Sequence, residues 1–149
     1  MVKKRTGEPW MPAPAYGQGL SGLSVNFLVS DVAAAGTFAE TVLTAKAVYA
    51  DPDFAVLRIA TETCAAEWML HADHTYAEHP LSGFIKGKTG RGIGAEFRLH
   101  GLDPDGAEGR ARAAGYTVLA GAADKAHGLR EAYILDDDGY CWTPDRPVT

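Results

Sequence analysis

The pattern of apolar and polar residues predicts a regular order of strands and helices from residue 24 onward. Apolar side chains alternate with more polar ones over residues 24–29, which is typical of a strand that buries one face. Asp31 can then cap an alanine-rich helix that continues to about Leu43. Three strand-like runs follow, at 47–50, 54–60 and 65–71. The first half of the chain is therefore predicted to be a βαβββ module.

The second half repeats this pattern. Residues 95–100 alternate again, Asp103 or Asp105 opens a second helix, and this helix ends near Ala114. The three further strand-like runs are 116–120, 129–135 and 140–143. The two halves share this order of elements, although their sequences are not identical. We therefore predict an α+β protein built from two paired βαβββ modules.

Domain boundaries follow from where the periodic pattern starts and stops. Residues 1–22 are rich in proline and glycine, so we expect an extended N-terminal arm without helix or strand. The run Lys86–Arg91 lacks the sequence context of a phosphate-binding loop and is interpreted as a flexible loop. The predicted domain is 23–146, divided into module one (23–71), a linker (72–92) and module two (93–146).

Composition narrows the range of partners. A formal net charge of −5 argues against a nucleic-acid or anionic-membrane surface. Cys64 and Cys141 are too few for a disulfide framework and are interpreted as small buried residues. No apolar run approaches the ~20 residues that span a bilayer, and the N-terminus lacks the apolar core of a secretory signal. We therefore expect a cytoplasmic protein without nucleic-acid or membrane partners.

The C-terminal segment carries the most specific motif. Residues 127–142 read as two strands joined by an Asp-Asp-Gly turn, in which Gly139 supplies a positive φ. With the strand-Asp-helix opening at Val25–Phe38, this segment resembles the vicinal oxygen chelate superfamily, which includes glyoxalase I, the bleomycin-resistance proteins and the extradiol dioxygenases. The resemblance covers about residues 23–146. It implies two cupped half-barrels around a common cleft, and a homodimer.

The resemblance also implies where a metal ion would lie. The positions that match the family's ligands are Ser24, Met69, Glu96 and Thr143. A two-residue slip would replace Met69 by Glu67 or His71. A thioether and two hydroxyls are poor ligands for Zn²⁺, Fe²⁺ or Ni²⁺, so we expect no metal cofactor at these positions. The alternative is a displaced site for a divalent transition metal made by His71, His74 and Glu96.

The alternation of side chains along each strand indicates which face the other polar and aromatic residues occupy. His71 and His74 point apart in an extended chain, so a ligand contact at the mouth of the cleft is preferred to a metal role. Asn26, Glu96 and Arg98 are expected to face the cleft, where Glu96 and Arg98 form a structural ion pair or orient a polar ligand. The aromatic residues expected to face the helices are Trp68, Tyr133, Tyr140 and Trp142. Trp10, Tyr76 and Phe84 lie in the arm and linker and are better candidates for capping a cleft.

Three functions compete at this point. The leading hypothesis is a bleomycin-resistance-like protein that binds a small organic molecule between its modules without metal. Its ligand-binding residues would be Ser24, Asn26, Met69, His71, His74, Glu96, Arg98 and Thr143. The alternative is a lyase, isomerase or dioxygenase that uses a displaced metal or acid-base chemistry by Glu96. A purely structural dimer rests only on the arm, whose Trp10 could pack against a partner subunit or against the protein itself.

Overall fold

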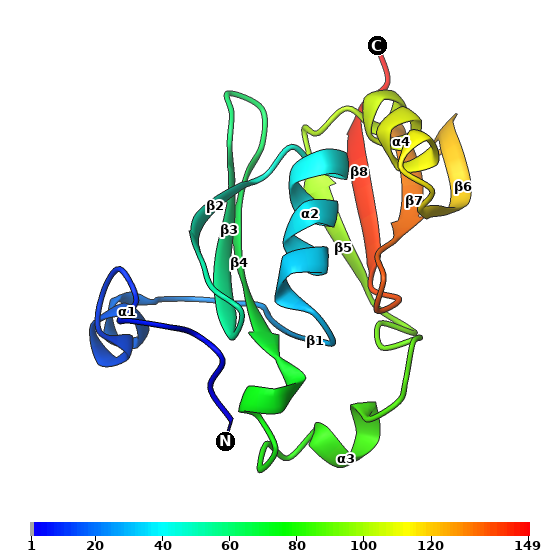
Figure 1. Ribbon diagram of the computed structural model, residues 1–149. Coiled ribbons are helices and arrows are strands. Elements are labelled where there is room, and N and C mark those ends of the chain that lie inside the picture. The colour runs from blue at the N-terminus through cyan, green and yellow to red at the C-terminus, as the bar shows by residue number, and fades with distance from the viewer. Residues whose placement is uncertain (1) are drawn as a thin grey trace.

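The computed structural model describes residues 2–149 and contains two four-stranded sheets (Figure 1). Module one consists of β1 (Asn26–Val29), α2 (Val32–Val42), β2 (Lys46–Ala50), β3 (Phe54–Ala60) and β4 (Ala65–Ala72). Module two consists of β5 (Glu96–His100), α4 (Pro104–Ala113), β6 (Thr117–Asp124), β7 (Leu129–Leu135) and β8 (Cys141–Pro147). The arm and linker add α1 (Ala13–Gly19), the short 3₁₀ helix η1 (Asp73–Thr75) and α3 (Ser82–Ile85). The predicted α+β class and both βαβββ modules are confirmed.

The two sheets have the same topology. Their strand orders are β1-β4-β3-β2 and β5-β8-β7-β6. In each sheet the first strand runs parallel to the last one of its module, and the remaining neighbours are antiparallel. Among the described residues, no helix is both long enough and apolar enough to cross a bilayer.

Aspartates start both long helices. The Asp31 side chain accepts a hydrogen bond from the Ala34 N–H at 3.0 Å at the start of α2. At the start of α4, the Asp103 side chain accepts from the N–H groups of Asp105 and Gly106, so Asp103 rather than Asp105 is the cap. These carboxylates satisfy helix N–H groups that have no partner within the helix.

The hydrophobic core lies between the modules. The rings of Trp68 and Trp142, from β4 and β8, have centroids 4.9 Å apart, and Phe27 contacts both Phe97 and Trp142. Phe38 of α2 meets Tyr116 edge to face at 4.8 Å. The helix-facing sides of the two sheets therefore share one core. Because side chains alternate along a strand, the opposite side of each sheet, here called its outer face, is turned away from that core.

The end of the linker is anchored at Arg91, the last residue of the run 86–91 that was interpreted as a flexible loop. The Arg91 side chain is only 3% exposed. Its two terminal nitrogens each donate to Asp73 at 2.8 Å, and one of them also donates to the Leu28 carbonyl oxygen. The Arg91 N–H donates to the carbonyl oxygen of Asp138 in the β7–β8 turn. Arg91 thus connects the linker to both modules.

The N-terminal arm contains a short helix, where the sequence predicted none. Prolines stand at the start of α1, where a missing N–H costs no helix hydrogen bond, so the proline-rich segment can begin a helix there. None of the residues of α1 is buried. In Figure 1 the arm (blue) lies beside β2 and β3, on the side of module one away from α2.

Candidate functional site

The predicted ligand-binding residues fall into two separate groups. Asn26, Met69 and His71 share the outer face of module one, where β1 and β4 pair in register. Glu96, Arg98 and Thr143 share the outer face of module two, and Ser24 is an exposed residue that precedes β1. Since both outer faces point away from the common core, the two groups do not meet within one chain.

His71 is the central polar residue of the outer face of module one. Its Nδ1–H donates to the Asn26 side-chain oxygen, which leaves Nε2 as a free acceptor. The imidazole contacts the rings of Phe54 and Tyr76, with centroids 4.6 and 4.7 Å away. Burial, with a smaller effect of His79, lowers the pKa of His71 from 6.5 to about 4. The ring is therefore neutral at physiological pH.

The N-terminal arm covers this face. The Trp10 indole stacks on Tyr49 at 4.6 Å and lies near Phe54 at 6.2 Å, while Tyr16 meets Trp10 edge to face at 5.3 Å. Residues 2–22 thus form an aromatic cover over the sheet. The arm was expected to lie against the protein or against a partner, and here it lies against its own module.

Asp53 holds the start of the arm. Its carboxylate accepts hydrogen bonds from the N–H groups of Lys4 at 2.8 Å and Arg5 at 3.2 Å. His74 Nε2 lies 2.7 Å from the same carboxylate, and the His74 carbonyl oxygen accepts from the Val2 N–H. Burial raises the pKa of Asp53, but the hydrogen bonds from His74, Lys4 and Arg5 outweigh it, so the net pKa is lowered. His74 therefore helps to hold the arm and does not form a common site with His71.

A cavity of about 490 Å³ remains between the arm and the sheet. Its wall is mostly apolar, and the charged residues that line it are Lys3, Arg5, Asp51 and Asp53. The residues that define it are Trp10, Met11, Tyr16, Phe54, Met69 and His71. This size and lining are typical of small-molecule sites, which combine an apolar wall with few polar groups. Trp10 and Tyr76, which the sequence suggested as residues that could cap a cleft, both line this cavity, whereas its position between the arm and module one was not predicted.

Module two presents a polar cluster on its outer face. One terminal nitrogen of Arg98 donates to Glu96 at 2.8 Å, and the other donates to Glu131 at 2.5 Å and to Asp145 at 2.9 Å. Glu131 and Asp145 are 2% and 1% exposed. Sequence reasoning missed both carboxylates, because each has an arginine as one neighbour in its strand, Arg130 beside Glu131 and Arg146 beside Asp145, and so looks like part of an exposed charged stretch. The Glu96–Arg98 pair is thus part of a larger network.

Glu131 stays ionised in this network. Burial raises its pKa, but the hydrogen bonds from Arg98, Tyr133 and His127 prevail and lower it to about 2. The Tyr133 hydroxyl donates to Glu131 at 2.5 Å. Tyr133 therefore lies on the outer face, which corrects its expected position against the helix. Its neighbours Ala132 and Ile134 are the residues of β7 that face the core.

Neither proposed set of metal ligands fits a transition metal. Within one chain, Ser24 and Met69 belong to one module and Glu96 and Thr143 to the other. The Glu96 oxygens already accept from Arg98 and from the Thr143 hydroxyl, at 2.8 and 3.3 Å. The alternative set of His71, His74 and Glu96 is likewise dispersed, because His74 bonds Asp53 and Glu96 lies on the other sheet. Within residues 2–149, no group of three or more histidine, cysteine or acidic side chains is arranged to hold a metal.

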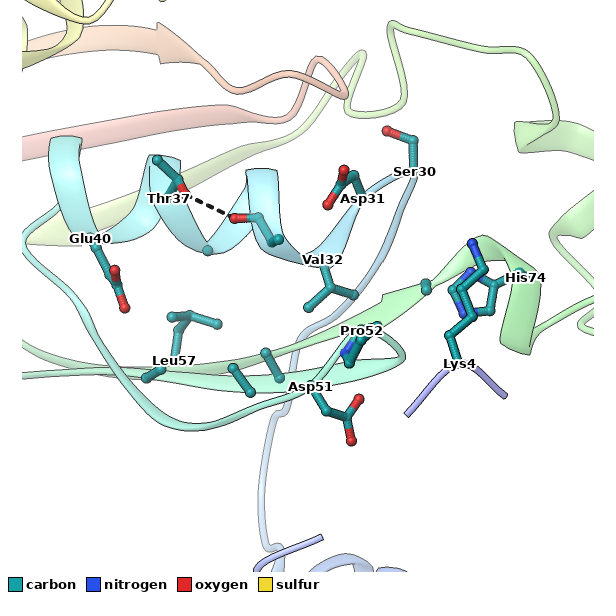
Figure 2. Close-up of a pocket in the computed structure, with 16 residues that line it drawn as sticks. Lys4, Ser30, Asp31, Val32, Thr37, Glu40, Asp51, Pro52, Leu57 and His74 are labelled. Carbon is teal, nitrogen blue, oxygen red and sulfur yellow. Dashed lines mark hydrogen bonds between the residues drawn. The ribbon is translucent and has the colours of Figure 1, made fainter. Parts of the chain in front are cut away.

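A second hollow, of about 520 Å³, lies on the core side of module one, between α2 and strands β2 and β3. Figure 2 shows Val32 and Leu57 pointing into it and the Thr37 hydroxyl bonded back to its own helix. Asp31 is engaged in capping α2, and Asp51 accepts from the N–H groups of the β2–β3 turn. With most of its polar side chains used locally, this hollow offers fewer groups to orient a ligand than the cavity under the arm.

The comparisons with known proteins concern the fold. No protein-family model and no curated protein matches the sequence. A glyoxalase/bleomycin resistance protein/dioxygenase family enzyme from Burkholderia phytofirmans PsJN superposes with a TM-score of 0.64 at 21% identity, over 84% of this chain and 97% of that chain. A glyoxalase-related enzyme from Fulvimarina pelagi gives a TM-score of 0.62 at 17% identity, over 85% and 88%. A glyoxalase/bleomycin resistance protein/dioxygenase from Nocardioides gives 0.58 at 18% identity, over 91% and 92%. The chain therefore has the fold of these glyoxalase/bleomycin resistance/dioxygenase proteins, which is the fold that the resemblance of its C-terminal segment implied.

Proposed function

We propose that this protein binds a small apolar molecule with a ring system in the cavity between its N-terminal arm and the outer face of module one. The observation that supports this best is the aromatic cover, since Trp10 and Phe54 offer flat faces on which a ring can stack. Met69 adds an adaptable apolar contact. Of the predicted ligand-binding residues, Met69 and His71 line this cavity and Asn26 holds His71, and the proposed binding needs no metal.

One polar group of the ligand can be recognised inside this cavity. The free Nε2 of neutral His71 accepts a hydrogen bond, so a hydroxyl or amide N–H on the ligand is favoured there. Lys3 and Arg5 are balanced by Asp51 and Asp53 in the same lining, so the cavity favours neither sign of charge on the ligand. The proposed ligand class is thus a ring compound with a hydrogen-bond donor at one end.

Tryptophan fluorescence provides a direct test. Trp68 and Trp142 are 4% exposed in the core, so changes on titration with a panel of phenols and aromatic amides report mainly on Trp10. Replacing Trp10 or His71 by Ala is expected to weaken binding, measured by calorimetry, about tenfold or more. As a matched control, Gly36→Leu fills the hollow beside α2 and is expected to leave affinity unchanged. Binding that survives Trp10→Ala and is lost in Gly36→Leu would contradict the proposal.

We also propose that the chain forms a homodimer. Four large apolar side chains are exposed on module two and the linker, namely Leu81, Phe84, Ile93 and Leu119. Leu81, Phe84 and Ile93 line one hollow beside β1 and Phe97, which makes a continuous apolar surface. In addition, only a second copy could bring an outer face of module one opposite an outer face of module two. Sedimentation of the Phe84→Asp and Ile93→Asp variants is expected to show a monomer, and a monomeric wild type would contradict this proposal.

An acid-base enzyme has less support. Glu96 is the only catalytic group that the sequence suggested, and its two oxygens accept hydrogen bonds from Arg98 and Thr143. A general base needs an oxygen within reach of the proton that it removes. The carboxylate of Glu96 is instead committed to the network of module two.

A further inference from the structure

The hydrogen-bond partner of His71 differs in chemistry from the partners of the other histidines. Three of the five histidines lie within 3.2 Å of a carboxylate oxygen, in the pairs His74–Asp53, His100–Asp145 and His127–Glu131. His71 is instead bonded to the amide of Asn26, which is the only asparagine in the sequence. A carboxylate partner favours the charged imidazolium, whereas a neutral amide has no charge with which to do so.

The strands that carry this pair fix its geometry. β1 runs parallel to β4 with Asn26 opposite Met69, and His71 is the next residue of β4 on the same outer face. The rings of Phe54 and Tyr76, with centroids 4.6 and 4.7 Å from the imidazole, restrict its rotation. Nδ1 is therefore held at the Asn26 oxygen, and Nε2 is the nitrogen left for the cavity that His71 lines.

The surroundings of His71 supply no negative charge that would protonate it. Burial is the main cause that lowers the pKa of His71, and His79 adds to it; among residues 2–149 no carboxylate counteracts these two effects. Tyr76 stays neutral, because burial raises the pKa of its hydroxyl. The charged residues that line the cavity are Lys3, Arg5, Asp51 and Asp53. Since their charges balance, the side chain at position 26 decides the protonation of the ring.

We propose that Asn26 is a positioning residue that fixes His71 as a hydrogen-bond acceptor toward the cavity. The Asn26 oxygen accepts only from a protonated Nδ1, so it selects the neutral tautomer whose Nε2 has a free lone pair. The consequence for specificity rests on the proposed function. A bound molecule must donate a hydrogen bond to Nε2, and a molecule without a donor is disfavoured because the buried nitrogen stays unpaired.

An aspartate at the same position would reverse this preference. Asn26→Asp keeps the shape of the side chain and still accepts from Nδ1–H. Its negative charge favours a second proton on His71, which would turn Nε2 into a donor. One amide therefore separates a site for hydrogen-bond donors from a site for acceptors.

The role of Asn26 can be tested without any ligand. Proton–nitrogen correlation NMR distinguishes protonated from unprotonated ring nitrogens. At about pH 5.5, wild-type His71 is expected to be protonated on Nδ1 only, because its pKa is about 4. In Asn26→Asp, His71 should bind its second proton at least about tenfold more tightly. As a matched control, Gln18→Glu makes the same change from amide to acid at an exposed residue of α1 and should leave the His71 signals unchanged.

A pair of probes with one shape tests the consequence for recognition. Indole donates a hydrogen bond through its N–H, whereas benzofuran has the same two rings and no donor. Calorimetry on wild type is expected to give about tenfold tighter binding of indole, and Asn26→Asp at about pH 5.5 should lose this preference. Equal affinity of wild type for both probes would contradict the proposal.

The remaining outcomes separate this proposal from the ligand proposal. A wild-type His71 protonated on Nε2, or His71 signals in Asn26→Asp that match wild type, overturns the role of Asn26. If neither probe binds while the NMR changes occur as expected, that role stands and the ligand class proposed for the cavity is wrong. If Asn26→Asp does not fold, Asn26→Ala takes its place and is expected to mix the two neutral tautomers, and an unchanged tautomer there overturns the proposal.

Discussion

The indole of Trp10 stacks on the phenol ring of Tyr49 with centroids 4.6 Å apart and planes inclined by 21°. Tyr49 is itself fixed, because its hydroxyl donates to Asp51 at 2.6 Å. A segment that carries no buried residue in its helix is therefore positioned by aromatic contacts with the sheet, together with the hydrogen bonds of its first residues to Asp53 and His74. The stacking contact forms a wall of the proposed ligand cavity, and its strength contributes to how firmly the cavity is closed.

Replacement of Trp10 by Ala is expected to lower the free energy of unfolding by about 1–2 kcal/mol, since a partly exposed aromatic side chain loses its stacking and burial. Chemical denaturation monitored by circular dichroism measures the change. Trp10→Phe keeps a flat ring and should retain most of the stability. Equal losses in both variants would mean that stacking is not the relevant contact.

Asp53→Asn is expected to release the start of the arm, because the neutral amide loses the charge-assisted hydrogen bonds from Lys4, Arg5 and His74. Trypsin cleavage after Arg5 should then be about tenfold faster than in wild type. Glu8→Gln changes only an exposed partner of Arg5, 3.8 Å away, and is the control. The tether assignment fails if both variants are cleaved at the rate of the wild type.

Acid is expected to destabilise the protein through His71. Its pKa is about 4 when folded and 6.5 when exposed, so the unfolded chain binds more protons between these values. The free energy of unfolding should therefore fall as the pH drops from about 6.5 to 4, by at most about 3 kcal/mol. In His71→Gln the stability in this range should be flatter, whereas His127→Gln, an exposed histidine, should follow the wild type.

Arg91→Ala is expected to destabilise the protein by about 3 kcal/mol or more, because it leaves Asp138 buried without its cation. The same change removes the hydrogen bonds that Arg91 donates to Asp73 and to the Leu28 carbonyl oxygen. Lys88→Ala, at an exposed residue of the same linker, should change stability by less than about 0.5 kcal/mol. Thermal unfolding of the two variants decides the matter, and similar midpoints would contradict the anchoring role of Arg91.

Two glycine substitutions should have opposite effects. At Gly101, φ is +89° and an added Cβ would lie 1.8 Å from the Thr63 carbonyl oxygen, so Gly101→Ala should cost about 3 kcal/mol or more. At Gly109 in α4 nothing lies within 4 Å of the added Cβ, so Gly109→Ala should stabilise by about 0.5–1 kcal/mol. Unfolding curves of both proteins check the pair. A tolerated alanine at 101 would show that the two modules can separate slightly at this contact.

The local pattern was sufficient for the order of elements. Asp31 caps its helix as predicted, and Asp103 is the one of the two predicted alternatives that caps α4, because a cap involves residues only two or three positions apart. The Asp-Asp-Gly turn is equally local, and Gly139 has the positive φ that it requires. These features depend on short stretches of chain, which the sequence displays directly.

The site could be predicted only in part, because its contacts are distant in sequence. Glu131 and Asp145 are opposite each other in the β7–β8 register, and only this register brings them to Arg98. An acidic residue in a strand would otherwise be interpreted as exposed. The packing of Trp68 on Trp142 likewise decides that the outer faces point apart, and no pattern within one strand contains that information.

The arm has a consequence for how new ligand preferences can arise. Residues 9–20 form a wall of the cavity, yet α1 contains no buried residue, whereas the sheet beneath is integral to the core. Changes to this wall can therefore alter what is bound without a large penalty in folding. Recognition and stability are encoded in separate stretches of the chain, so a library confined to the arm could explore many ligands on one unaltered scaffold.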